Sequence, residues 1–240
     1  MVALREGPAT SNVPGREPAR RVKTVETFTR GQLGVVRVRT EDGAEGYGQL
    51  STFNADVSAM VMHRQVARYA LGQNPLDADG IVDRCIEGNY KYPGSYVRRA
   101  LAGLDTALWD LRGKLEGSSV CELIGGTPRP FPVYGSSMRR DIRPEQEAER
   151  LAALKESSGY RAFKIRVGKV CGHDEDQWPG RTEALIPAVR RAIGDETSLL
   201  ADGNSCYTPE RAVEVGRLLE QYGGCHFEEP CPYWELEWTA

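Results

Sequence analysis

The stretch GGCHFEEPCPYW, residues 223–234, has the pattern of a short strand that ends in two carboxylates and a proline. Buried strands rarely hold ionised carboxylates unless a partner compensates the charge. Glu228 and Glu229 therefore need a compensating group at the end of this strand. The residues that lie opposite them decide the fold of this part of the chain.

A strand-then-helix rhythm runs through the chain from about residue 130 to this stretch. The predicted strands are 131–138, 161–168, 197–204 and 225–230, and the predicted helices between them are 143–158, 181–194 and 208–223. Proline begins the first helix, and Thr208 with Pro209 forms an N-cap and first position for the third. Alternating βα units favour a parallel sheet, either doubly wound or closed as a barrel.

Polar side chains gather at the carboxyl end of each predicted strand. They are Ser136, Ser137, Lys164, Arg166, Asp202, Asn204, Glu228 and Glu229. Active sites of (β/α)₈ barrels are built at that end, and no glycine-rich phosphate loop supports a dinucleotide-binding sheet instead. Because residues i and i+2 share a face, we expect His226 one layer below Glu228, inside the barrel, and Phe227 packed outward against helices.

The gathered groups suggest a site for a hard divalent cation. Carboxylates from adjacent strands suit Mg²⁺, and cations beside them could hold a substrate carboxylate or move a proton. Each motif alone has an ordinary reading: Asp202 in a DGN turn, Glu228 in a loop before proline, and Lys164 with Arg166 on a solvated strand. The constellation at successive strand ends favours the metal site.

The first 125 residues have a different pattern. Alternation around an EDG turn predicts a hairpin with strands near 33–40 and 44–50, and helical spacing predicts a helix over 95–117 that Gly117 closes. We therefore expect three regions: a flexible arm at 1–21, an α+β domain at 22–128, and a partial barrel of about four strands at 129–240.

Composition limits the classes of function. The 240 residues are 40% hydrophobic and 27% charged, with a net charge of −3, so nothing favours nucleic acid or an anionic membrane as partner. No apolar run approaches a membrane span. Six scattered cysteines predict reduced thiols and a cytoplasmic protein, and a zinc site at Cys225 and Cys231 has the wrong spacing.

Four motifs together resemble the enolase superfamily, of the mandelate racemase/muconate lactonizing enzyme type. ALAGLDTALWDLRGKLEG followed by LIGG resembles the end of its capping domain, and FKIRVG resembles its K-x-K strand. LLADGNSCYTPERA and CHFEEP resemble its first two metal-ligand strands. The resemblance implies an α+β capping domain followed by the first half of a modified TIM barrel.

The resemblance also implies residue roles. Asp202 and Glu228 would be Mg²⁺ ligands, Asn204 the amide that often follows the first ligand, and Lys164 would face the substrate carboxylate or the enediolate. With Ser136, Asn204 is our candidate for substrate contact. Arg166 departs from the family pattern, because arginine stays protonated and is a poor proton acceptor where a lysine base is usual. Either Lys164 takes the proton, or Arg166 binds substrate and another strand supplies the base.

The function implied is a Mg²⁺-dependent dehydratase (a hydro-lyase) that acts on an acid sugar, a small-molecule carboxylate, in a protein that we expect to be a homo-oligomer. A racemase, epimerase or cycloisomerase of the same superfamily is the alternative. A barrel needs about 250 residues, and the third metal ligand would follow Glu228 by about 25 residues. We therefore expect a chain truncated at its C-terminus, and a non-catalytic fragment is a third possibility.

Overall fold

The computed structural model describes residues 20–240 and divides the chain into two compact units. One unit ends at Arg129, and the other runs from Pro130 to Ala240. The division falls one residue past the domain boundary that the sequence predicts. The arm predicted at 1–21 lies outside the described residues except for its last two.

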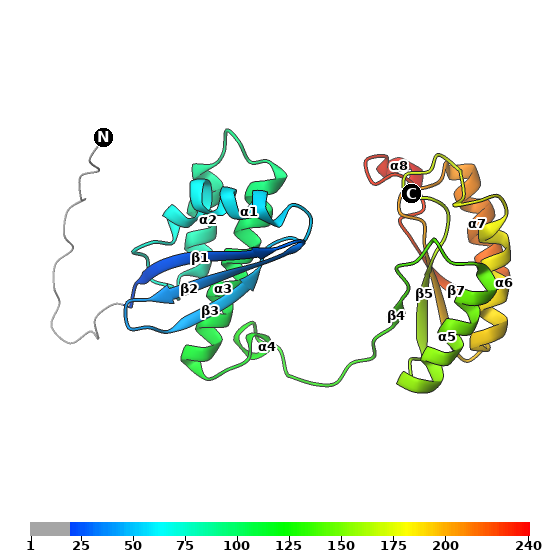
Figure 1. Ribbon diagram of the computed structural model, residues 1–240, viewed down its shortest axis with the longest axis horizontal. Coiled ribbons are helices and arrows are strands. Elements are labelled where there is room, and N and C mark those ends of the chain that lie inside the picture. Colours follow the sequence, from blue (N-terminus) through cyan, green and yellow to red (C-terminus); the bar gives the residue numbers. More distant parts are fainter. Residues whose placement is uncertain (1–19) are drawn as a thin grey trace. The chain divides into compact units, whose positions relative to one another are not determined.

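The first unit is an antiparallel sheet packed against a long helix, as the sequence indicates (Figure 1). Its strands are β1 (Val22–Arg30), β2 (Leu33–Thr40) and β3 (Glu45–Gln49). Its helical segments are α1 (Ala55–Val61), a π-helical turn (Met62–Val66), a 3-10 turn (Ala67–Tyr69), α2 (Ala78–Gly88), α3 (Ser95–Glu116) and α4 (Val120–Leu123). The strand β1, paired along its length with β2, is an addition to the predicted hairpin.

Strand β3 lies unusually close to helix α3. A Cβ atom on Gly46 or Gly48 would stand 2.1 Å from a backbone oxygen of α3, on Ala107 and Gly103 respectively. The backbone N–H of Tyr47, between the two glycines, donates to the Asp110 carboxylate at 2.7 Å. Only glycine permits this approach, so the two positions fix the depth at which the helix packs on the sheet. Helix α3 ends at a left-handed Gly117, as predicted.

The second unit is a parallel sheet with the strand order β4-β5-β6-β7. Its strands are β4 (Gly135–Ser136), β5 (Ala162–Arg166), β6 (Ser198–Asp202) and β7 (Gly224–Glu228). Its helices are α5 (Pro144–Ser158), α6 (Arg181–Ile193), α7 (Pro209–Gln221) and the short α8 (Leu236–Thr239). Pro144 begins α5 and the Thr208 hydroxyl caps α7, so both helix starts are confirmed.

Side-chain alternation divides this sheet into two faces. Helices α5, α6 and α7 lie on one side of it in Figure 1, and their core contains Phe163, Ile165, Leu199 and Ala201. Phe227 packs at the border of that core, as predicted. The intervening residues of each strand point to the opposite face, which is the interior face of a barrel. Four parallel strands covered on one side match the predicted partial barrel.

Two details of the sheet differ from the sequence prediction. Strand 131–138 is reduced to Gly135–Ser136, because Pro132 cannot donate to a strand ladder and β4 is an edge strand of the sheet in residues 20–240. His226, predicted in an inner layer, is exposed. It lies on β7, the other edge strand of the described sheet, where β6 flanks it on one side and no strand of residues 20–240 lies on the other.

Candidate functional site

The register of the parallel sheet brings the predicted ionic residues into one row. Arg166 is the register partner of Asp202, and Asp202 is the partner of Glu228, so the last residues of three adjacent strands lie side by side. Lys164, two residues before Arg166, shares its face and is the partner of Ser136 on β4. All of these residues lie on the face without helices, at the carboxyl end of the sheet.

The opposite charges in this row are in direct contact. The Lys164 ammonium donates to the Glu228 carboxylate and lies 3.6 Å from the nearer Asp202 oxygen. The Arg166 guanidinium donates to Asp202. Asp202 is 1% exposed and Lys164 is 5% exposed, whereas the Glu228 side chain keeps 37% of its surface accessible. The cations of β5 therefore compensate the carboxylates of β6 and β7, as the sequence requires.

The environment of Lys164 favours its charged form. Burial opposes the ammonium ion, but hydrogen bonds to Glu228 and Tyr134 and the nearby charge of Asp202 outweigh it, so the pKa of Lys164 is raised. The ammonium also lies 5.4 Å from the centre of the Tyr134 ring. In this arrangement Lys164 holds a proton at Nζ and can donate a hydrogen bond to an anion. To accept a proton it must first lose part of this carboxylate contact.

Asn204 links the row of charges to the loops that follow the strands. Its Oδ1 accepts from Arg166 Nη1 at 2.7 Å and from Arg140 Nη2 at 2.8 Å, and its Nδ2 donates to a Glu229 carboxylate oxygen at 3.1 Å. Its backbone N–H donates to Asp202 Oδ1 at 2.9 Å. The amide therefore bridges cations to carboxylates at this end of the sheet.

Three residues without glycine's freedom adopt left-handed backbone conformations beside this row. They are Asn204 (φ 44°), Ser205 (φ 62°) and Glu229 (φ 44°). Two of them are bonded through their backbones, with the Ser205 N–H donating to the Glu229 carbonyl at 2.8 Å. Such conformations cost free energy and persist where surrounding bonds hold them, and they cluster at functional sites. Here they place the Asn204 amide next to the charged row.

Ser136 lies beside this network and is not bonded into it. The residue is exposed on β4, and within residues 20–240 its hydroxyl bonds to none of the four ionic side chains. Its neighbour Ser137 is more involved, because the Ser137 carbonyl accepts from Arg166 Nε at 3.2 Å. Ser136 and Ser137 both line a pocket of about 180 Å³ against α5. Contact of Ser136 with a substrate stays a prediction.

Arg140 is a residue of this site that sequence reasoning missed. It follows β4, and besides Asn204 its Nε contacts the Gly168 carbonyl at 3.1 Å after β5. Burial lowers the pKa of Arg140, and the nearby Arg166 charge adds to this effect. Because Arg140 lies in a loop, no strand periodicity places it on the site face. The only hint in the sequence is its position shortly after the predicted first strand.

The carboxylates have the chemistry of a partial Mg²⁺ site. Two carboxylates in register on adjacent parallel strands, one buried and one partly open, are hard oxygen donors of the kind that Mg²⁺ selects. In residues 20–240, no group of three His, Cys, Asp or Glu side chains is arranged to hold a metal ion. The residues present therefore fit two ligands of a magnesium site whose remaining ligands would be water, substrate or residues outside the described part.

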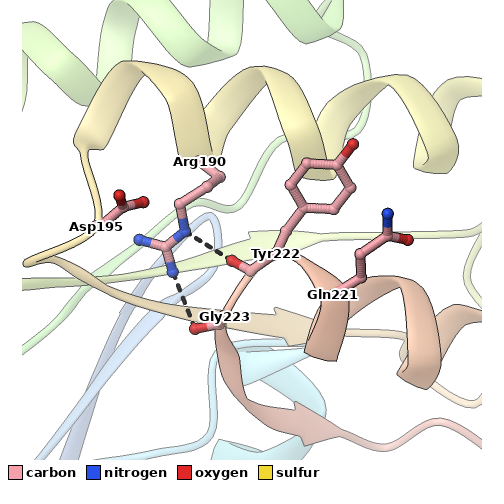
Figure 2. Close-up of a pocket in the computed structure, with 5 residues that line it drawn as sticks. All are labelled: Arg190, Asp195, Gln221, Tyr222 and Gly223. Carbon is pink, nitrogen blue, oxygen red and sulfur yellow. Dashed lines mark hydrogen bonds between the residues drawn. The ribbon is translucent and has the colours of Figure 1, made fainter.

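Another pocket in the second unit is structural. It has a volume of about 290 Å³, is lined by Arg190, Asp195, Gln221, Tyr222 and Gly223, and lies at the amino ends of the strands (Figure 2). The Arg190 guanidinium fills one side of it by donating to four carbonyl oxygens, those of Tyr222, Gly223, Gly194 and Thr197, at 2.7–3.0 Å. The active sites of barrels lie at the opposite end of the strands, so this pocket is not a competing site.

Comparisons with known proteins agree with this arrangement. The family model for the mandelate racemase/muconate lactonizing enzyme N-terminal domain matches residues 10–125, and the model for the enolase C-terminal domain-like family matches residues 146–240. No helix among the described residues has the length and apolar character that crossing a membrane requires.

Curated relatives include a D-galactonate dehydratase family member of Catenulispora acidiphila, 32% identical over 84% of this chain and 52% of its own length. Another is an arabinonate dehydratase of Saccharolobus solfataricus, 26% identical over 83% of this chain and 52% of its own length. The chain thus spans about half the length of the curated relatives it matches.

Solved structures give the same assignment. A racemase candidate from Roseobacter denitrificans is 56% identical, with a TM-score of 0.88 over 91% of this chain and 60% of its own. A mandelate racemase/muconate lactonizing protein from Paracoccus denitrificans, complexed with magnesium, is 30% identical, with a TM-score of 0.84 over 91% of this chain and 61% of its own. Both units of the chain therefore belong to the enolase superfamily, in its mandelate racemase/muconate lactonizing enzyme branch.

Proposed function

We propose that this chain carries the first part of the active site of a Mg²⁺-dependent sugar-acid dehydratase. The observation that supports it most is the row Arg166, Asp202 and Glu228, joined to Lys164, at the carboxyl ends of three adjacent parallel strands. The reaction removes the proton α to a carboxylate and expels the β-hydroxyl as water, which leaves a 2-keto-3-deoxy acid. Dehydratase names among the relatives support this class of reaction.

In this proposal each side chain has a task set by its surroundings. Asp202 and Glu228 would hold Mg²⁺, which when bound supplies positive charge next to the substrate carboxylate. Lys164 is the group that can exchange a proton at Nζ once its contact with Glu228 is released, because lysine loses a proton far more readily than arginine does. Arg166 stays protonated and binds negative charge. The cytoplasm as location and a homo-oligomeric state belong to the same proposal.

Magnesium binding by the 240-residue chain tests the proposal first. Calorimetry should give a dissociation constant below about 1 mM, because two carboxylates in register supply hard oxygen ligands, and the Asp202→Asn variant should lose this binding. Asp195→Asn, which changes a carboxylate at the opposite end of the sheet, is the matched control and should bind as the unsubstituted chain does. A folded sample without binding, or binding that Asp202→Asn leaves intact, would contradict the assignment of the ligands.

The 56% identity to a racemase candidate supports a second function, racemisation or epimerisation at the same site. The two reactions share the loss of the α-proton and differ in the fate of the resulting enediolate. Incubation of sugar acids in D₂O separates them, because a racemase incorporates deuterium at the α-carbon and releases no keto acid. A dehydratase releases a keto acid that a carbonyl reagent detects.

A further inference from the structure

Arg140 lies where three strands of the second unit end. It follows β4, and its side chain contacts the Gly168 carbonyl after β5 and the Asn204 side chain after β6. One guanidinium therefore connects the carboxyl ends of three adjacent strands. Within residues 20–240 it makes no ion pair with a carboxylate, unlike its neighbour Arg139, which pairs with Asp141 on the surface.

The Asn204 amide transmits this contact to the charged row. Two guanidinium donors point at Oδ1, which fixes that atom as the oxygen and leaves Nδ2 to donate to Glu229. Removing Arg140 would leave Arg166 as the single cation on that oxygen. The amide would then be held by Arg166 and Glu229 alone, so its oxygen could shift together with the Arg166 guanidinium.

Arg166 depends on the same amide for its direction. Its Nη1 is shared between Asp202 and Asn204, and its Nε donates to the Ser137 carbonyl at 3.2 Å. Arginine binds with a rigid planar fork, so a shift of one acceptor tilts the whole group. A tilt would move the charge that faces Asp202, although Arg140 itself touches neither carboxylate of the row.

We propose that Arg140 is a positioning residue that acts through Asn204 to hold the Arg166 guanidinium against Asp202. Arg140 transfers no proton and binds no metal in this role. The inference rests on the proposed function only in that the group it positions is one to which we assign a part in catalysis. The positioning itself is a property of the described residues and can be measured without turnover.

Hydrogen exchange of the Arg166 Nε–H, followed by nitrogen-15 NMR on the 240-residue chain, tests the proposal. In Arg140→Gln this proton should exchange at least several-fold faster than in the unsubstituted chain, because its bond to Ser137 loosens when the guanidinium tilts. Arg139→Gln, which removes a neighbouring surface cation, is the matched control and should leave the rate unchanged. Equal protection of the Arg166 proton in Arg140→Gln and the unsubstituted chain would overturn the proposal.

A double variant shows whether the effect passes through the amide. If it does, adding Arg140→Gln to Asn204→Ala should accelerate exchange no further than Asn204→Ala alone, whereas additive acceleration would overturn the route through Asn204. Backbone amide spectra of β5 and β6 identify a variant that has unfolded. In that case Arg140→Lys replaces Arg140→Gln. It is the milder change because lysine keeps the positive charge, and it still tests the contact because lysine lacks the fork that spans both acceptors. Magnesium binding is measured separately: its absence with faster exchange would contradict the proposed function and leave the positioning role intact.

Discussion

Asp105 on α3 is a partly buried carboxyl group in the first unit. Burial raises its pKa above the ordinary value of 3.8, the charge of Asp79 on α2 raises it further, and a hydrogen bond from Trp109 lowers it in part. Between the unfolded and the folded pKa, the folded chain binds more protons than the unfolded chain. The free energy of unfolding therefore falls as the pH rises through that interval.

The Asp105→Asn variant should remove this dependence. At pH 7 it should unfold at a higher denaturant concentration than the unsubstituted chain, because asparagine carries no charge to desolvate and can still accept from Trp109. The difference should shrink as the pH falls toward 3.8, where the unsubstituted carboxyl becomes protonated. Urea unfolding at several pH values measures it. Asp83→Asn on α2, an exposed position, is the control, and an equal gain there would contradict the burial argument.

The close contact between β3 and α3 depends on glycine at positions 46 and 48. In Gly48→Ala the new Cβ would stand 2.1 Å from the Gly103 carbonyl oxygen and 2.8 Å from the Ala107 nitrogen, both backbone atoms that cannot turn aside. Overpacking of this kind costs about 1–3 kcal/mol or more of the free energy of unfolding. Gly94→Ala, where a Cβ meets nothing within 4 Å, should lose only what alanine costs at the N-cap of α3, about 1 kcal/mol or less. Chemical denaturation measures the free energy of unfolding of both variants. Similar losses would mean that β3 and α3 can move apart enough to accommodate the added methyl group.

Helix ends, which depend on nearby residues, were predicted better from the sequence than strands, which depend on pairing with distant segments. Gly117, Pro144 and Thr208 act on their own helix ends, so the sequence alone places those ends correctly. Strand β1 was missed because its pairing depends on β2. The strand at 131–138 was overextended because Pro132 and its position at the sheet edge outweigh its apolar residues. The length of an edge strand is set by its neighbours, which a local pattern does not contain.

The site could be predicted where periodicity controls it. Alternation along β5 and β6 puts Lys164, Arg166 and Asp202 on one face, and parallel register then brings Glu228 alongside them. The contacts of Arg140 could not be foreseen, because they depend on a loop and on the left-handed turn at Asn204. His226 was misplaced because alternation gives the face of a residue and not whether a neighbouring strand covers it.

At the scale of the whole molecule, the two units should behave as separate cores. Each has its own cluster of buried apolar side chains, and residues 124–134 between them are exposed and form no helix or strand. Brief digestion with a broad-specificity protease should therefore cut in that segment and leave two resistant fragments. Mass spectrometry identifies the cut sites. If the first cuts fell inside β5 or α3 instead, one of the units would be unfolding locally faster than the protease cleaves residues 124–134.

The four hydrogen bonds from the Arg190 guanidinium to backbone carbonyls concern the unfolding rate of the second unit. The acceptors at Tyr222 and Gly223 lie 32 and 33 residues along the chain, and they reach the guanidinium only after α7 has led the chain back to the start of β7. We expect these bonds to form after the transition state of folding, because both chain segments must be ordered before the guanidinium can bridge them. Arg190→Ala should then speed unfolding more than it slows refolding. Stopped-flow kinetics measures both rates, and an equal or larger effect on refolding would contradict late formation of the Arg190 bonds.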